Sequence, residues 1–113
     1  MDGLTLVNDL QYKLNMVNKA IDTLAKNGQA KAKAEMEYRI ALRQEILTER
    51  EKGTPVTIVG DVCRGHPKIA ALKFARDTAE VVYDANMEAI MAWKMEAKML
   101  ESQIGREWGR KDV

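Results

Sequence analysis

The chain has 113 residues, 46% of them hydrophobic and 31% charged, and its 18 basic and 17 acidic side chains leave a formal charge of +1. This composition is typical of a single globular or coiled-coil domain and excludes an intrinsically disordered chain. The balanced charge shows no basic patch of the kind that holds nucleic acid strongly, and the single cysteine excludes an internal disulfide.

The N-terminal residues contain no basic segment followed by an apolar run, so we expect no signal peptide. No part of the sequence approaches the ~18 consecutive apolar residues that a membrane-spanning helix needs. A single free thiol fits a reducing compartment. We therefore expect a protein that does not associate with a membrane.

The first predicted helix covers about residues 4–26. Its apolar side chains recur in alternating steps of three and four residues, the spacing of a helix that presents one seam to a partner helix. These residues are Val7, Leu10, Leu14, Val17, Ile21 and Leu24. Because the opposite side is polar, this seam is the predicted buried face.

The second predicted helix covers about residues 29–52 and follows Asn27-Gly28, a pair that suits a turn or a helix end. Carried past Gly28, the heptad pattern falls on the charged residues Lys31, Glu35 and Glu45. Two interpretations follow. In one, the chain turns at Gly28 and the second helix runs back along the first. In the other, one helix continues with a shift in phase, because a single glycine costs only ~1 kcal/mol in a helix interior.

Residues 53–66 are predicted as a non-helical loop. Gly53 follows a basic last turn and precedes Pro55, which is typical of a helix end. Residues 56–59 are mostly β-branched, but a lone short strand would have no sheet partner within the chain. The segment is therefore either an extended cover over the end of the helical bundle or a strand paired between subunits.

The same loop contains a cluster of chemically capable side chains: Asp61, Cys63, Arg64 and His66. A structural zinc site needs four ligands, whereas the chain has one cysteine and one histidine. A cysteine–histidine nucleophile pair needs an orienting third residue, and none is recognisable. We therefore expect no catalytic residue, no metal and no cofactor, with Cys63 buried, Asp61 or His66 capping the backbone, and Arg64 bonded to a carboxylate or carbonyl.

The longest predicted helix covers about residues 67–108 and begins at Pro67, because proline is tolerated in the first helical turn. Its seam alternates steps of four and three: Leu72, Arg76, Ala79, Tyr83, Asn86, Ile90, Trp93, Ala97, Leu100 and Ile104. Ala75, Val82 and Ala89 are expected to widen this seam. Asn86 is expected either to fix the register or to lie at the solvated rim.

Four methionines on this helix are candidates for partner binding. Met87, Met91, Met95 and Met99 recur every four residues, and methionine suits adaptable hydrophobic contacts. They form either an exposed partner site or ordinary core packed on the other helices.

The end of the long helix combines an aromatic residue with basic residues. Trp108 is a candidate protein contact. The candidate nucleic-acid contacts are Arg106, Arg110 and Lys111.

Three stretches of the sequence resemble a group of small helical proteins encoded by bacteriophages and prophages. They are residues 35–42; residues 55–59 with Asp61 and residues 64–67; and residues 100–104 with residues 107–108. The resemblance spans roughly residues 4–108. It implies a phage origin and action in the host cytoplasm, and it carries no functional residue with it.

The sequence thus predicts a single all-α domain, residues 1–113, built as an elongated antiparallel helical hairpin or three-helix bundle with coiled-coil-like packing. Because helices of unequal length leave part of the long helix uncovered, we expect a homodimer or higher homo-oligomer. The expected function is that of a non-enzymatic phage accessory protein, a helical protein–protein interaction module that acts on a host or phage factor. The alternative is a nucleic-acid-binding accessory of phage recombination or replication.

Overall fold

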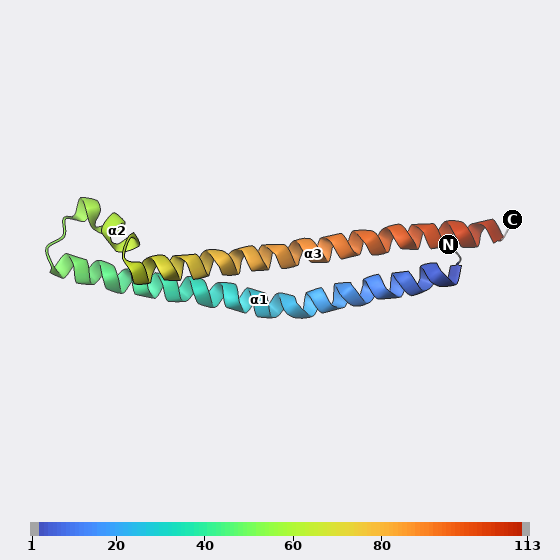
Figure 1. The fold of residues 1–113 in the computed structure, drawn as a ribbon, viewed down its shortest axis with the longest axis horizontal. Coiled ribbons are helices and arrows are strands. Elements are labelled where there is room, and N and C mark those ends of the chain that lie inside the picture. The colour runs from blue at the N-terminus through green and yellow to red at the C-terminus, as the bar shows by residue number, and fades with distance from the viewer. Residues whose placement is uncertain (1–2, 112–113) are drawn as a thin grey trace. The chain divides into compact units, whose positions relative to one another are not determined.

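The computed structural model describes the backbone of residues 3–111 and the side chains of residues 3–109. It contains helices α1 (Gly3–Glu51), α2 (Val56–Arg64) and α3 (Pro67–Lys111), as Figure 1 shows. Residues 3–111 form no strand, so the prediction of an all-α fold is confirmed. Within this described range, no helix has a stretch both long enough and apolar enough to cross a bilayer.

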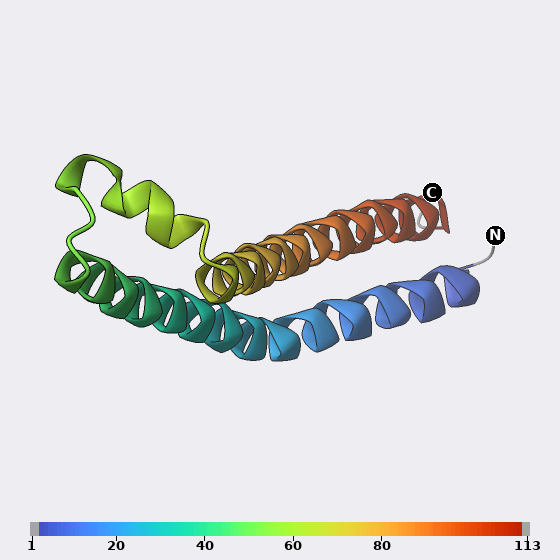
Figure 2. The same cartoon turned by 60° about the vertical axis from the view of Figure 1, so that its left-hand side comes forward.

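Contacts divide the chain into two compact units. The terminal unit comprises residues 1–26 and 84–113, and the central unit comprises residues 27–83. In the terminal unit, the first part of α1 and the last part of α3 run antiparallel (Figures 1 and 2). In the central unit, the rest of α1 packs with α2 and the first part of α3.

Helix α1 passes through Gly28 without a turn, so the helices predicted at about residues 4–26 and 29–52 are one helix of 49 residues. Among the described residues, Gly53 is the glycine with a positive φ, and Gly28 keeps a helical backbone. A Cβ atom at Gly28 would lie 3.5 Å from Cε2 of Tyr83. This is an ordinary van der Waals distance, so the Tyr83 ring leaves room for a Cβ atom at position 28.

The heptad pattern of α1 also continues past Gly28 with no shift in phase. Positions in steps of three and four remain buried or half-buried on both sides of Gly28: Leu24, Asn27, Lys31, Ala34, Tyr38, Ala41 and Glu45. The charged residues that seemed to end the pattern therefore lie on the packed face of the helix.

Helix α1 ends in a Schellman motif at Gly53, whose φ is +89°. The Gly53 N–H donates to the Arg50 carbonyl and the Thr54 N–H donates to the Glu49 carbonyl, both over 3.1 Å. The Thr54 hydroxyl also donates to Oε2 of Glu49 over 2.8 Å, and this hydrogen bond is the main reason that the pKa of Glu49 is lowered. Glycine is favoured at this position because it adopts the left-handed conformation without strain.

Replacing Thr54 with valine tests this helix end. The pKa of Glu49 is lowered in the folded state, so its carboxylate contributes stability above the unfolded-state pKa, and that contribution is lost as the pH falls through the folded-state pKa. We expect Thr54→Val to raise the pKa of Glu49 towards its ordinary value, and to make unfolding stability less sensitive to acid. An NMR pH titration of the Glu49 carboxyl measures the shift, with Thr78→Val as the control at an exposed position. An unchanged Glu49 titration in Thr54→Val would contradict the assignment.

Residues 53–66 connect the two long helices as predicted, but residues 56–64 form the helix α2 instead of irregular structure or a strand. Pro55 precedes the helix, and its carbonyl accepts hydrogen bonds from the N–H groups of Ile58 and Val59. A helix satisfies its backbone groups internally, whereas a four-residue strand would need a partner strand that residues 3–111 do not provide. The need to satisfy backbone hydrogen bonds therefore outweighs the preference of these β-branched residues for a strand.

The predicted seam of α3 is confirmed along its whole length. The residues that the pattern selected, from Leu72 to Ile104, are all buried or half-buried. Of the positions expected to widen the seam, Ala89 is half-buried, but Ala75 and Val82 are exposed and that part of the prediction is wrong. The contact made by α3 is therefore a narrow seam, as in a pair of helices, and its outer face lies open among the described residues.

The buried face of α1 in the terminal unit is rotated from the predicted one. The predicted residues that lie on this face are Leu10, Val17 and Leu24. The predicted residues that are exposed, at 41–45% of their surface, are Val7, Leu14 and Ile21. The residues that lie on the buried face in their place are Leu6, Lys13 and Ala20.

Candidate interaction surfaces

The side chains of α3 explain the rotated face of α1 in the terminal unit. Asn86 is 9% exposed, and its Nδ2 donates to the Ala20 carbonyl over 2.8 Å. This bond needs a small residue at position 20 so that the two backbones approach closely. Asn86 therefore lies in the seam and not at a solvated rim, and its bond to one carbonyl of α1 fixes the register of the two helices.

A second contact of the terminal unit surrounds Trp93. The Lys13 Nζ lies 5.2 Å from the centroid of the Trp93 ring and 3.5 Å from Oε2 of Glu96. Tyr12 meets the same ring edge to face, with the centroids 6.3 Å apart. The flexible lysine stem covers apolar surface while its ammonium group stays close to both the carboxylate and the ring.

In the central unit, each charged heptad position of α1 has a matching group across the seam. The Lys31 Nζ lies 4.7 Å from the centroid of the Tyr83 ring, and Oε2 of Glu35 lies 3.5 Å from Nε of Arg76. Oε1 of Glu45 lies 3.9 Å from Nε2 of His66. The charges are thus part of the interface. Their sequence signal was present across the seam, where Arg76 and the Tyr83 ring of α3, and His66 just before α3, occupy the opposing positions.

Arg76 is the centre of the polar interface in the central unit. Its guanidinium lies 4.5 Å above the Tyr38 ring and donates to Oδ1 of Asp77 from Nε and Nη2, over 3.1 and 3.0 Å. The bond to Asp77 is the main cause of a raised pKa for Arg76. Hydrogen bonds from Lys73 and then from Arg76 lower the pKa of Asp77. The cluster therefore stays ionised at neutral pH and acts as a fixed structural contact.

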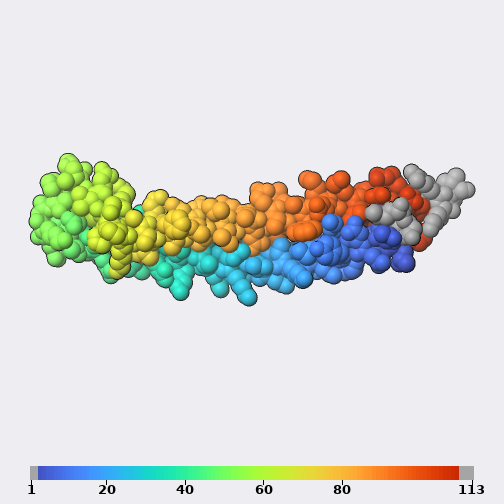
Figure 3. All heavy atoms as spheres, viewed as in Figure 1, coloured from blue at the N-terminus to red at the C-terminus, as the bar shows by residue number. Residues whose placement is uncertain are grey.

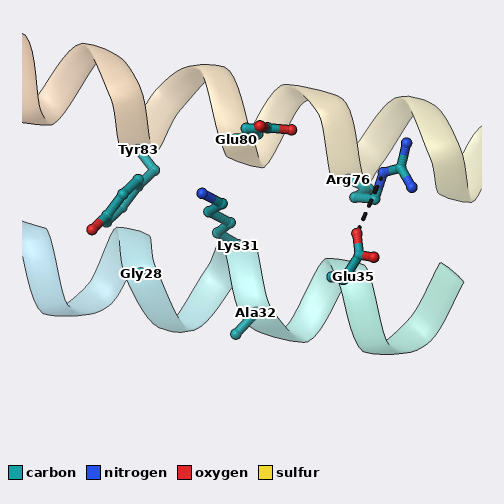
Figure 4. A pocket seen from close by; sticks show the side chains of 7 residues that line it. All are labelled: Gly28, Lys31, Ala32, Glu35, Arg76, Glu80 and Tyr83. Carbon is teal, nitrogen blue, oxygen red and sulfur yellow. Dashed lines mark ion pairs between the residues drawn. The ribbon is translucent and has the colours of Figure 1, made fainter. Parts of the chain in front are cut away.

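Two open hollows, each of about 410 Å³, border the ion pair between Glu35 and Arg76. Figure 4 shows the first of them. Its lining residues are Gly28, Lys31, Ala32, Glu35, Arg76, Glu80 and Tyr83. The lining combines two cationic and two acidic side chains, so it has no charge preference for an anion or a cation. Its lining side chains carry no thiol and no hydroxyl other than the Tyr83 phenol, and we assign no chemistry to it.

The loop cluster does not assemble into a reactive site. Cys63 is fully buried, and burial is the main cause of a raised pKa for its thiol, with Glu45 and Glu49 adding to the effect. A raised pKa keeps the thiol protonated and a poor nucleophile. The Nδ1 of His66 accepts the Lys68 N–H over 3.3 Å, at the start of α3. Arg64 and Asp61 form an exposed ion pair of 3.3 Å on α2.

The methionine stripe of α3 is solvent-exposed instead of forming core. Met87 is 39% exposed, and Met91, Met95 and Met99 are 61%, 66% and 66% exposed. In the same segment Ile90 and Ala97 are buried, on a face of the helix about 100–120° away from Met91. Figure 3 shows one face of the terminal unit, on which α3 (orange) and α1 (blue) both reach the surface.

Trp108 is 54% exposed at the end of the terminal unit, beside the exposed Arg106. The side chains of Arg110 and Lys111 lie outside the described residues. The basic group predicted for nucleic-acid contact is therefore described at Arg106 alone.

The described residues contain no group of three or more histidine, cysteine, aspartate or glutamate side chains placed to hold a metal ion. Comparisons with protein-family models, with curated proteins and with solved structures find no match for this chain.

Proposed function

We propose that this chain is a non-enzymatic helical protein that works by binding another protein through the outer face of α3. The observation that carries the proposal is the exposure of Met91, Met95 and Met99, each between 61% and 66%. Their spacing of four residues aligns them in one ridge along a helix. The other side of the same segment is already packed on α1, so the ridge is a second apolar contact surface.

Burial of this ridge would contribute favourably to association. Complete burial of one methionine side chain contributes ~1.5–3 kcal/mol, and about two thirds of the surface of Met91, Met95 and Met99 remains to be covered. Methionine is flexible and polarizable, and it is enriched at surfaces that bind helical partners. Single exposed apolar residues are normal, whereas a row of four on one helix indicates a contact site.

The biological setting is proposed from the resemblance to small helical phage proteins. That resemblance supports an accessory protein that acts in the host cytoplasm on a host or phage factor. The balanced charge of the chain supports a protein partner over nucleic acid, because nucleic-acid binding depends on many phosphate contacts from basic residues.

Site-specific photo-cross-linking in host cells tests the proposed function. Met95 is replaced by a benzophenone amino acid in one variant, and Asp22, exposed on the outer side of α1 in the same unit, is replaced in the control. We expect Met95 to cross-link to a protein of different sequence, identified by mass spectrometry, and Asp22 to give no such adduct. Adding Met91→Lys should reduce the Met95 adduct by on the order of tenfold, because binding would bury an unpaired charge.

Two results would overturn the proposed function. One is equal labelling from Met95 and Asp22, which would show random collision. The other is an adduct at Met95 that joins only two copies of this chain, which would leave the surface without a different protein as its partner.

A further inference from the structure

The charges beside the methionine ridge are segregated by sign. Asp84 and Glu88 precede Met91, whereas Lys94 and Lys98 follow it, and all four are exposed. Among the described residues, none of the four takes part in an ion pair. Opposite charges four residues apart are paired at Glu35–Arg39 over 2.7 Å and at Lys73–Asp77 over 2.9 Å, whereas Arg39–Arg43 and Glu45–Glu49 place like charges at the same spacing.

This arrangement does not stabilise an isolated helix. Asp84 and Glu88 lie four residues apart, as do Lys94 and Lys98. Like charges at this spacing repel each other on a helix surface. The helix itself therefore gains no stability from this pattern.

The charges are symmetric about Met91. The acidic residues lie seven and three residues before it, and the basic residues lie three and seven residues after it. Met87 and Met95 lie four residues before and after it. At about 3.6 residues per turn, all of these side chains fall within about 60° of Met91 around the helix axis. They form one face, which we call the Met91 face: Asp84, Met87, Glu88, Met91, Lys94, Met95 and Lys98.

We infer that the Met91 face binds the Met91 face of a second copy of this chain, with the two α3 helices antiparallel and a two-fold axis at Met91. The inference goes beyond the proposed function, because it names a second copy of the chain as an occupant that would compete with a different protein for Met91 and Met95. In this arrangement Asp84 faces Lys98 of the second copy near the centre line of the contact. Glu88 lies level with Lys94 of the second copy along the helix axis, but on the opposite edge of the contact. Each pair occurs twice, as two-fold symmetry requires.

The apolar part of the face matches in the same register. Met91 meets its own counterpart on the axis, and Met87 lies level with Met95 of the second copy. A parallel arrangement would instead set acids beside acids and lysines beside lysines. Charge complementarity therefore selects the antiparallel orientation and the register together.

Sedimentation velocity of two full-length variants with reversed charges tests the inference. The acidic variant carries Lys94→Glu and Lys98→Glu, and the basic variant carries Asp84→Lys and Glu88→Lys. We expect the unchanged protein to show a concentration-dependent monomer–dimer equilibrium. We expect each variant alone to dissociate with a Kd higher by on the order of a hundredfold. An equimolar mixture of the two variants should recover the dimer, and a misfolded variant could not be rescued in this way.

Single-cysteine cross-linking tests the orientation. Under mild oxidation, we expect Asp84→Cys mixed with Lys98→Cys to give the mixed disulfide, and we expect little disulfide between two Asp84→Cys chains. The buried Cys63 serves as the internal control, because the unchanged protein should give no cross-linked dimer.

Three outcomes would overturn the inference: an unchanged protein that is monomeric at all concentrations, a dimer that tolerates both charge variants, or an Asp84→Cys self-disulfide that forms as readily as the mixed one. These outcomes are separate from a failure of the proposed function. A monomeric chain that still cross-links to another protein through Met95 would remove the dimer and keep that function. A charge-dependent dimer with no other protein partner would support the dimer and remove the proposed function.

Discussion

Replacing Gly28 with proline is expected to destabilise the protein by ~3 kcal/mol or more, whereas Gly28→Ala is expected to stabilise it by ~0.5–1 kcal/mol. Proline at this position removes a backbone N–H from the middle of the 49-residue helix α1, and its ring clashes with the carbonyl of the preceding turn. Alanine is the better helix former, and its Cβ would meet Cε2 of Tyr83 at 3.5 Å, an ordinary contact distance.

Urea unfolding followed by circular dichroism at 222 nm measures both changes. The alanine variant is the control for the loss of glycine itself, because it changes the side chain and keeps the N–H. If the chain turned at Asn27-Gly28, Gly28→Ala would instead destabilise the protein, because replacing a glycine in the left-handed conformation with alanine introduces strain. A destabilised Gly28→Ala variant would therefore contradict the continuous helix.

Leu6→Ala is expected to cost ~2–5 kcal/mol, the typical penalty for emptying a closed site in a core. Leu6 has no exposed surface, although the heptad pattern of the sequence assigned the buried position to Val7. Among the side chains of residues 3–109, few large ones are fully enclosed, so each one carries a large share of the packing free energy.

The neighbouring Leu4 supplies a matched control, since it has the same side chain on the same helix and is 72% exposed. Leu4→Ala should change the unfolding free energy by no more than about 0.5 kcal/mol. Chemical denaturation at fixed protein concentration measures both variants, because self-association would otherwise add to the apparent stability. Equal losses for Leu4→Ala and Leu6→Ala would contradict the assigned face of α1.

The part of the fold that the sequence predicted best is α3. Its seam alternates steps of four and three across Arg76 and Asn86, and both polar residues lie in the packed face as the spacing requires. Spacing is sufficient here because one helix geometry places every member of the series on one side. The all-α class followed from the same long runs without proline.

The face of α1 could not be predicted from α1 alone. Two adjacent series share Leu10, Val17 and Leu24, and the more apolar series includes Leu14. The structure uses the other series, because Asn86 and Trp93 of α3 need the small Ala20 and the flexible Lys13 opposite them. Contacts with α3 therefore decide which of the two faces of α1, offset by about one residue, is buried.

The candidate interaction surface could likewise be predicted only in part from the sequence. The four-residue spacing of the methionines could be read from the sequence, but whether they form core or surface depended on which face of α3 was covered. The symmetry of charge about Met91 was also present in the sequence. It had no meaning until the structure placed that side of the helix away from α1.

The sequence by itself determined that the chain is helical, where the helix ends at Gly53, and which side of α3 is packed, because backbone hydrogen bonding, glycine conformation and residue spacing are local properties. The tertiary structure decided that α1 passes through Gly28, that residues 56–64 are helical, and that Lys31, Glu35 and Glu45 belong to an interface. The three charged positions depend on groups distant in sequence, Tyr83, Arg76 and His66, which offset the cost of partly burying them. The free energy that decides them comes from pairing between helices, which no single segment contains.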